Sequence, residues 1–500
     1  MINEHIRYHK WTANESGTFF RSLNELLNTR SSQFYMPLFS LYFYIHNQPK
    51  ATQRIDLERN FYVRKVNAIT KERYYNSNMF LKGEIYDTSK NITIEKEFFC
   101  KTIPIIDPIQ CMNNNYNFVQ RNNYHLPSTY NYNTFHKINN LDNTAYIDVF
   151  CSYLFGRLTY LNLNPSFALY YGSSNSIGNY KYDITEEYHD IKVDKAFNDA
   201  IGKAFSIDMY ISDSEEETDK SDTEKEDTDS DIESIPRSSL SSFMTNSSTK
   251  SDKSDNSDDL EDDYIATIKD IPIQHLYIEK LEGTLEDLLD ENIEEEVVLS
   301  CFFQISFALT YLQKHFQFTH NDLHINNIMY SETTTKYLYY KYNNIYYRVP
   351  TYGKIFKIID YGRAILTYKN KTYLNDVFSK HGEAGGQYSY PSQVSFLYND
   401  AQCKDNIQPN FHFDLCRLSM TILEELKGDD YSGEIIEFLK KLCLNRKNES
   451  FCEMRDDFKL YISIAKDACN CLPREVIVNS IFKKYRVKKS VFPRKSFYTL

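Results

Sequence analysis

The chain has 500 residues and a mass of 59.2 kDa, and its 41% hydrophobic content is enough to build a large core. This content excludes a collagen-like or fully disordered chain. The net charge of −12 comes from residues 212–263, which hold 19 Asp and Glu against 5 Lys and Arg. The rest of the chain holds 52 basic and 50 acidic residues, so we expect a nearly neutral folded body with one disordered acidic insertion, placed at 207–264.

The ten cysteines form neither a regular disulfide framework nor a zinc-ligand pattern. Residues 1–11 are polar, which argues against a secretory signal, and the longest uncharged stretch, 297–313, is too short and too polar for a membrane span. We therefore expect a protein of a reducing, cytoplasmic compartment, neither secreted nor transmembrane, with no membrane partner.

Strand patterns dominate the chain before the insertion. Runs of aromatic and β-branched residues predict strands at 61–69, 80–86 and 96–106. Apolar residues then repeat at helical spacing over 143–161, where Asn143 or Thr144 can cap a helix. The aromatic residues within 1–60 indicate an N-terminal extension that packs on these strands.

Helical patterns dominate the chain after the insertion. A buried strand is predicted at 273–281 and a long amphipathic helix at 292–316. This order, strands first and helices later, predicts an α+β protein whose strand-rich and helix-rich lobes enclose a cleft.

The strongest functional signal follows the long helix, where residues 320–327 read His-Asn-Asp-Leu-His-Ile-Asn-Asn. Asp322 and Asn327, five residues apart in one loop, suit phosphoryl transfer. The Asp322 carboxylate would accept the proton of the attacking hydroxyl, and the Asn327 amide oxygen would ligate Mg²⁺. Leu323 and Ile328 are apolar and are expected to anchor the loop to the core.

A second signal lies at 356–362, where an apolar strand ends in Asp360, followed by Tyr361 and Gly362. A carboxylate at the end of a strand that faces a cleft can bridge Mg²⁺ to the phosphates of a nucleotide. Asp322 and Asp360 also have a simpler interpretation, as a turn residue and a strand-end cap.

Together these motifs resemble the protein-kinase superfamily, and in particular the divergent kinase-like proteins of giant DNA viruses. The resemblance places Asp322 at the catalytic-loop Asp, and Asn327 and Asp360 at the two metal ligands. It implies a bilobal fold, ATP and Mg²⁺ as cofactors, and transfer of the γ-phosphoryl group to Ser or Thr of a protein substrate. A viral protein of this kind would act in the host cytoplasm or reside in the virion.

The same resemblance assigns a hinge between the lobes to residues 278–285. Ile278 would be the gatekeeper, and the backbone of Glu279 and Leu281 would bond adenine. Downstream, Asp414 would bond backbone amides of the catalytic loop and so have a structural role, although an ordinary helix cap explains it too.

A kinase also needs a lysine on its third strand and an acidic residue on the following helix. Lys101 shares a strand face with Phe99 and Ile103, where a surface lysine is not expected, and Asp148 lies beside the apolar stripe of the 143–161 helix. We assign Lys101 to the phosphates and Asp148 as its partner. A charge on an edge strand is the competing interpretation of Lys101.

Three features depart from the family. No Gly-x-Gly-x-x-Gly precedes Lys101, Asn321 replaces the usual Arg, and His324 replaces the usual Lys. His324 also occurs in small-molecule phosphotransferases that resemble aminoglycoside and choline kinases, and the missing glycines suit a pseudokinase scaffold. Both alternatives therefore stay open.

Two further segments have no assigned role. Aromatic runs around Asn343 predict a β-hairpin at 337–349, interpreted as an ornament rather than a stacking platform, so nucleic acid is not expected as a partner. The tail 483–500 has seven basic and no acidic residues; a solvated tail is the simplest interpretation, and self-interaction with the acidic insertion is a second hypothesis. The predicted organisation is an extension at 1–60, an N-lobe at 61–280, a C-lobe at 281–482 and a basic tail at 483–500.

Overall fold

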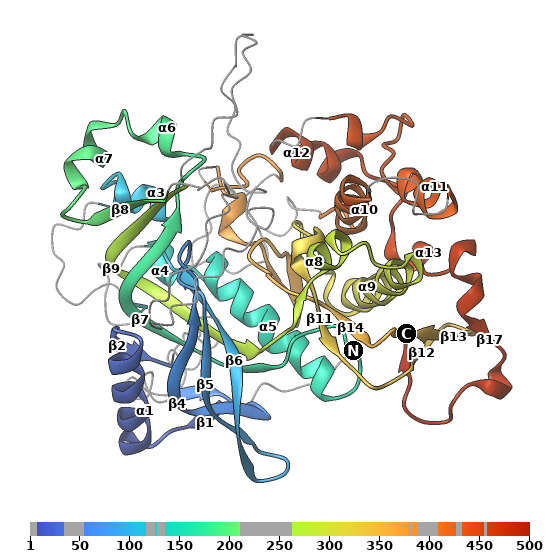
Figure 1. The fold of residues 1–500 in the computed structure, drawn as a ribbon, viewed down its shortest axis with the longest axis horizontal. Coiled ribbons are helices and arrows are strands. Elements are labelled where there is room, and N and C mark those ends of the chain that lie inside the picture. The colour runs from blue at the N-terminus through green and yellow to red at the C-terminus, as the bar shows by residue number, and fades with distance from the viewer. Residues whose placement is uncertain are drawn as a thin grey trace, which may run out of the picture.

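The computed structural model describes residues 8–34, 55–116, 126–127, 136–210, 263–380, 382–388, 409–426, 433–454 and 458–500. These residues form a mixed structure of sheets and helices, which confirms the predicted α+β class. A strand-rich part and a helix-rich part lie side by side, and α5 (Thr144–Tyr160) runs between them (Figure 1).

The strand-rich part is built on a seven-stranded sheet with the order β2-β7-β9-β6-β5-β4, in which β8 also pairs with β9. All of its pairings are antiparallel. Its strands are β2 (Arg30–Gln33), β4 (Phe61–Glu72), β5 (Met79–Asp87), β6 (Ile92–Pro104), β7 (Tyr170–Asp183), β8 (Phe205–Tyr210) and β9 (Asp263–Glu279). The three strands predicted before the insertion correspond to β4, β5 and β6.

The boundaries predicted for the acidic insertion are wrong at both ends. Strand β8 continues to Tyr210 and pairs there with Asp263, the first residue of β9. The ordered chain therefore includes residues 207–210 and 263–264, because ladder hydrogen bonds hold these polar residues in a sheet where their composition alone predicts disorder. The rest of the predicted insertion lies outside the described residues.

Helix α1 (Ala13–Leu26) packs its aromatic face on the sheet. Thr12 caps the helix in a capping box with Glu15, and Phe19 and Phe20 are buried against Phe98 of β6. The expectation that the N-terminal extension packs on the strands is confirmed for residues 8–34; Tyr35, Phe39, Tyr42, Phe43 and Tyr44 lie outside the described residues.

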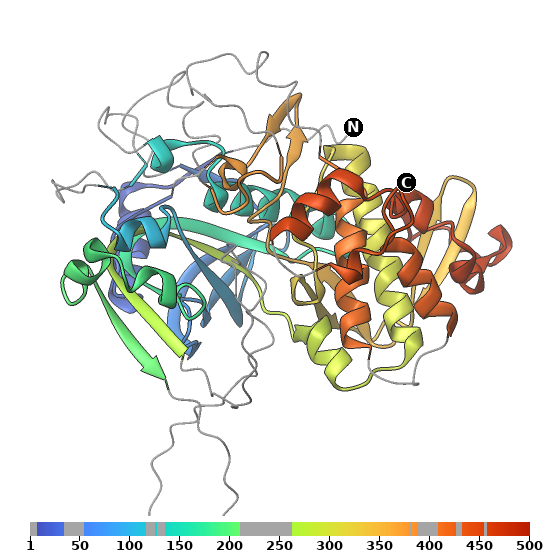
Figure 2. The same ribbon diagram turned by 90° about the horizontal axis from the view of Figure 1, so that it is seen from above.

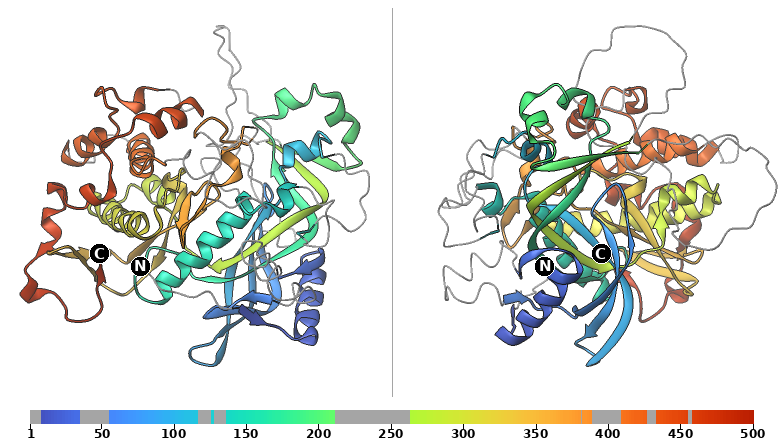
Figure 3. Two further views of the ribbon diagram at one scale, coloured as in Figure 1. Left: turned by 180° about the vertical axis from the view of Figure 1, so that it is seen from behind. Right: turned by 60° about the vertical axis from the view of Figure 1, so that its left-hand side comes forward.

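Helix α5 covers the opposite face of the sheet (Figure 3). Its predicted range of 143–161 matches within one residue at each end, and the Asn143 side chain caps it by accepting from the Ala145 N–H at 3.0 Å. Because side chains alternate along β6, Phe98 and Cys100 lie in the core under α1, whereas Lys101 points toward α5.

The helix-rich part surrounds α9 (Glu295–Phe316), the predicted long helix, which begins three residues later than expected. Its neighbours are α8 (Leu285–Asp290), α10 (Phe413–Glu425), α11 (Gly433–Leu442), α12 (Phe458–Asp467) and α13 (Pro473–Val476). Among the described residues, α9 is long and apolar enough to cross a membrane, but its most apolar window is 89% buried inside the protein, where it forms the core.

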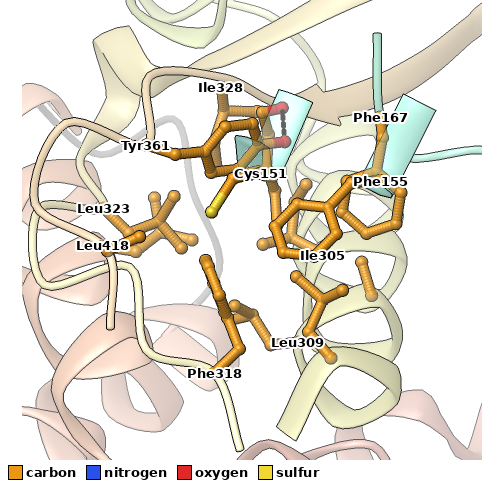
Figure 4. Close-up of a cluster of buried hydrophobic side chains, with 14 of the residues drawn as sticks. Cys151, Phe155, Phe167, Ile305, Leu309, Phe318, Leu323, Ile328, Tyr361 and Leu418 are labelled. Atoms are coloured by element: carbon orange, nitrogen blue, oxygen red, sulfur yellow. Dashed lines mark hydrogen bonds between the residues drawn. The ribbon is translucent and has the colours of Figure 1, made fainter. Parts of the chain in front are cut away.

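One apolar cluster joins α5, α9, α10 and the loop that carries Asp322 (Figure 4). Leu323 and Ile328 are fully buried in it, as predicted, beside Phe155 and Tyr361. The backbone on either side of Asp322 is therefore held by the core, because exposing these side chains would cost about 1.5–3 kcal/mol each.

Two small sheets complete this part. The first has the order β10-β11-β14, with β10 (Gly283–Thr284), β11 (Ile328–Glu332) and β14 (Lys354–Ile358). The second has the order β17-β13-β12-β18, with β12 (Tyr337–Tyr342), β13 (Ile345–Pro350), β17 (Arg486–Val487) and β18 (Tyr498–Thr499). Strands β12 and β13 form the predicted hairpin, which turns at Asn343 and Asn344.

The expectation of a solvated basic tail is wrong. β17 pairs with β13, β18 pairs with β12, and the turn between α13 and β17 buries Phe482 and Tyr485 against Phe303 of α9. Aromatic residues interleaved with the lysines bury enough surface to hold the segment in place, which a count of charge alone does not reveal.

The remaining helices and strands are short. They are β1 (Tyr8–Lys10), β3 (Ile55–Leu57), α3 (Pro108–Met112), α4 (His136–Asn139), α6 (Tyr188–Ile191), α7 (Lys195–Ala200), β15 (Leu366–Tyr368) and β16 (Lys371–Tyr373).

Candidate active site

The loop between α9 and β11 carries Asp322 and Asn327, and buried carboxylate bonds shape it. The Asp414 carboxylate on α10 accepts from the N–H of His320 at 3.0 Å and of Asn321 at 2.9 Å. This is the structural role that the sequence assigned to Asp414. Asn321 adopts the left-handed conformation (φ +63°), and its side chain donates to the Arg363 carbonyl at 3.0 Å.

Asp322 is 6% exposed and lies beneath α12. The Tyr461 hydroxyl donates to its Oδ1 at 3.3 Å. Burial raises the pKa of Asp322 to about 8, against the lowering effect of the nearby Arg363 guanidinium. A carboxyl group with a pKa near neutral is suited to take up and release a proton.

Asn327 is oriented by hydrogen bonds at one end of its amide. Its Nδ2 donates to the Asp322 carbonyl at 2.8 Å and lies 3.0 Å from Nε2 of His324. Burial lowers the pKa of His324 to about 3, so the ring is neutral at pH 7 and its Nε2 can accept this bond. The Asn327 Oδ1 accepts no hydrogen bond from any described residue, which leaves this oxygen free for a ligand.

Asp360 follows β14 and lies next to the loop, since the Ile359 N–H donates to the Asn327 carbonyl at 3.1 Å. It adopts a left-handed conformation (φ +59°) that is costly outside glycine and marks a residue held by its surroundings. Its Oδ1 accepts from the Gly362 N–H at 3.2 Å and pairs with Lys101 Nζ at 2.8 Å. Although burial acts in the opposite direction, this ammonium lowers the pKa of Asp360 to about 2.

Lys101 connects the seven-stranded sheet to Asp148 on α5 and to Asp360 after β14. Its Nζ contacts Asp148 Oδ2 at 2.7 Å as well as Asp360, so the predicted pair of Lys101 and Asp148 is present. Asp148 is fixed from the other side, because its Oδ1 accepts from the Tyr361 N–H at 3.1 Å. Burial disfavours the Lys101 charge, but the two carboxylates outweigh it and raise the pKa of the ammonium. Lys101 is therefore not a charge on an edge strand: β6 lies inside the sheet, between β5 and β9.

The predicted hinge residues lie between β9 and α8. Ile278 is 9% exposed and, like Lys101, points to the α5 side of the sheet, because it shares a core with residues of α5. The Leu281 N–H donates no hydrogen bond to any described residue. An amide that binds adenine must be available in this way. The Glu279 N–H, by contrast, already donates to the Leu169 carbonyl at 3.0 Å and is not available to a ligand. Its side chain pairs with the buried Lys357 at 2.8 Å.

Residues 73–78 connect β4 to β5 and contain no glycine. The Asn78 side chain accepts from the Thr102 N–H at 2.9 Å, directly beside Lys101 in β6. The Ser77 hydroxyl accepts from the Lys181 N–H at 2.7 Å. Polar side chains thus tie this connection across the sheet, instead of a glycine backbone free to wrap around phosphates.

Several residues around Asp322 were not found in the sequence. Arg363 and Arg417 lie 5.5 and 5.4 Å from the Tyr461 ring, and Arg363 pairs with Glu383 at 4.0 Å. The position of Arg363, directly after the Asp-Tyr-Gly motif, was the one available signal. Tyr461 lies 139 residues beyond Asp322, and no spacing rule connects the two.

The residues present fit a Mg²⁺ ion that is bound mainly through a nucleotide. Among the described residues there is no group of three His, Cys, Asp or Glu that could hold a metal without help. Asn327 Oδ1 and Asp360 Oδ2 form no hydrogen bonds to described residues, and both are the hard oxygen donors that Mg²⁺ prefers. Mg²⁺ is commonly held by one or two protein oxygens plus phosphate oxygens, and these two oxygens would be the protein ligands in such an arrangement.

No protein-family model matches the chain, and no curated protein matches its sequence. The geometry described above is therefore the basis for a functional conclusion.

Proposed function

We propose that this chain is a divergent member of the protein-kinase superfamily with a bilobal kinase-like fold, and that it transfers the γ-phosphoryl group of ATP to Ser or Thr of a protein. The observation that carries the proposal is the convergence of three side chains from separate elements next to the loop of Asp322 and Asn327. Lys101 on β6 contacts Asp148 on α5 and Asp360 after β14, and the N–H of Ile359, the residue before Asp360, donates to the carbonyl of Asn327.

In this mechanism Asp322 orients the acceptor hydroxyl and takes its proton as the oxygen attacks the γ-phosphorus. Lys101 holds the phosphates, and Asp148 keeps the ammonium in place. The backbone N–H of Leu281 binds the adenine. When bound, Mg²⁺ held by Asn327 and Asp360 would neutralise the charge of the phosphates.

The position of His324 removes one argument for a small-molecule acceptor. The residue that suggested a small-molecule phosphotransferase is 5% exposed, and its ring is bonded to Asn327. It therefore supports the loop and does not reach a substrate.

The test is transfer of label from γ-labelled ATP by the full chain, with and without Mg²⁺, to a casein-like protein and to soluble amines and alcohols. We expect labelled protein only with Mg²⁺. Asp322→Ala should lower the rate roughly 10²–10⁴-fold, since this is the usual contribution of a general base. Asp199→Asn, an exposed change on α7, is the matched control and should behave as the wild type. Equal signals from wild type, Asp322→Ala and Asp360→Asn would rule out catalysis here and leave a pseudokinase scaffold. Label on the amines or alcohols and none on protein would show that the acceptor is a small molecule and not a protein.

A further inference from the structure

The sheet β17-β13-β12-β18 joins two segments that are far apart in the sequence. The aromatic hairpin forms its centre, and the basic C-terminal segment forms both of its edges. In Figures 1 and 2 this sheet lies at the end of the molecule farthest from the seven-stranded sheet. Neither segment carries a role in the proposed phosphoryl transfer.

One face of this sheet belongs to the core and the other is open. Tyr340 and Tyr347 are fully buried, and their rings lie 5.4 and 4.9 Å from Phe303 of α9. The residues that alternate with them point away from α9. Tyr337 on this outer face is 39% exposed, and the Arg348 guanidinium lies 4.7 Å from the centre of its ring.

The C-terminal segment extends the aromatic surface of the outer face. Phe492 contacts Tyr339 at 5.7 Å and Tyr346 at 4.9 Å between ring centres, and Phe497 lies 5.1 Å from Phe492. All four of these rings are partly accessible. A row of partly exposed aromatic rings with cations beside them is unusual for a purely structural ornament, since its apolar area is left in water.

The charge of this region has a single sign. Residues 336–350 and 483–500 contain ten Lys and Arg and no Asp or Glu. All seven basic side chains of the C-terminal segment are exposed, and their one ion pair with a described residue is Lys484 with Glu296 at 3.6 Å. In an otherwise nearly neutral body, this concentration creates a local positive potential that attracts polyanions.

We propose that this outer face, formed by β12, β13 and residues 486–499, binds single-stranded nucleic acid. Lysine and arginine would neutralise the phosphates, and the exposed rings would stack on the bases, which are free to stack only when they are unpaired. The sequence alone did not predict such a partner, because the aromatic and basic segments are separated by more than 130 residues and meet only in the folded sheet.

An acidic peptide explains the charge of the face but not its rings. The acidic residues 212–263 of this chain are one example of such a peptide. Aspartate and glutamate also have no flat apolar surface to stack on Tyr337. Nucleic acid satisfies both features at once.

The test is fluorescence anisotropy with the full chain and a labelled 20-nucleotide single-stranded RNA at several salt concentrations. Three variants separate the contributions. The first variant, Lys488→Ala/Arg494→Ala/Lys495→Ala, removes three exposed charges from the face. The second, Tyr337→Ala, removes its most exposed ring. The third, Lys65→Ala/Lys195→Ala/Lys269→Ala, is the matched control and removes three exposed charges elsewhere.

We expect the first variant to weaken binding at least tenfold and to reduce the slope of log K against log salt by about 2, since each lost phosphate contact on a single strand changes this slope by about 0.7. Tyr337→Ala should weaken binding roughly five- to a hundredfold with the slope unchanged, which is the signature of lost stacking. The control should stay within about twofold of the wild type, and an unchanged Tm shows that each variant is folded.

Three results would overturn the proposal. Wild-type affinity in Tyr337→Ala, or equal binding of duplex RNA and heparin, would reduce the face to a general polyanion site. Equal weakening by the control variant would place the contact elsewhere. Failure of both the full chain and a chain lacking residues 212–262 to bind RNA would exclude nucleic acid as the ligand of this face.

Discussion

Asp322 and Asp360 lie in neighbouring loops, yet their surroundings shift their pKa values in opposite directions. Asp322 is almost fully buried and touches a tyrosine hydroxyl, and burial raises its pKa to about 8. The side chain of Asp360 is 41% exposed and touches an ammonium, which lowers its pKa to about 2. Burial thus disfavours the ionised form of Asp322, whereas Lys101 favours the ionised form of Asp360. Opposite shifts of the pKa can thus be obtained for the same type of side chain by changing its contacts.

The largest effect is expected where the permanent charge is removed. Asp360→Asn keeps the shape of the side chain but takes away the charge that faces Lys101 and the phosphates. Labelled-ATP transfer should fall roughly 10²–10³-fold, a usual loss for one electrostatic contact to a transferred group. Unaltered transfer in this variant would contradict the role of Asp360 while leaving that of Asp322 open.

A smaller loss is expected for the partner that holds Lys101. Asp148→Asn weakens one of the two ion pairs of Lys101, and transfer should fall roughly tenfold, because a hydrogen bond to a charged group contributes about 1.5–3 kcal/mol. The double variant Lys101→Met/Asp148→Asn should be no slower than Lys101→Met alone. Additive losses would show that Asp148 acts independently of Lys101.

The comparison also predicts how stability depends on pH in metal-free protein. Because the pKa of Asp322 is higher in the folded chain than in the unfolded one, the folded state binds this proton more tightly. Asp322 therefore destabilises the fold progressively as pH rises from about 4 toward about 8, and fully above that range. Asp322→Asn should raise Tm by roughly 2–4 °C at pH 9 and leave it unchanged near pH 4. An equal gain at both pH values would exclude the titration of Asp322 as its cause.

The smallest effect is expected for Tyr461→Phe. The lost hydroxyl stabilises the ionised form of Asp322, so its removal should move the upper end of that pH window upward by about half a unit. The measurement is the difference in Tm between Tyr461→Phe and Tyr461→Phe/Asp322→Asn as a function of pH, and in particular the pH above which this difference stops growing. The same difference is measured between the wild type and Asp322→Asn, and the two pH values are compared. A downward movement would show that the hydroxyl favours the protonated carboxyl group.

The elements that the sequence predicted are those with a strong local pattern. The 3.6-residue repeat located α5 and α9 within three residues, and aromatic runs located β4, β5, β6 and the hairpin. Strand β7 was missed, because Ser173, Ser174, Asn175 and Ser176 carry no strand pattern and are buried only between β2 and β9. Helix α1 was missed for a similar reason, since its polar first turn conceals the face that Phe19 and Phe20 present to the sheet.

The residues of the candidate site also fall into two groups, those that the sequence predicted and those that only the fold revealed. The motif spacing was enough to propose Asp322, Asn327 and Asp360, and the alternation along β6 was enough to propose Lys101. Tyr461, Arg363 and the blocked N–H of Glu279 required the fold, because each depends on a contact made across long stretches of chain.

The sequence by itself determined which residue types stand at which local spacing, and so the secondary structure of the strongly patterned segments and the chemistry that three carboxylate and amide side chains can offer. The tertiary structure alone decided which carboxyl group is buried and which meets Lys101, and it alone placed the basic tail beside the aromatic hairpin. The physical reason is that spacing is a local property of the chain, whereas desolvation and charge contacts are set by whichever distant residues the fold brings within a few ångströms.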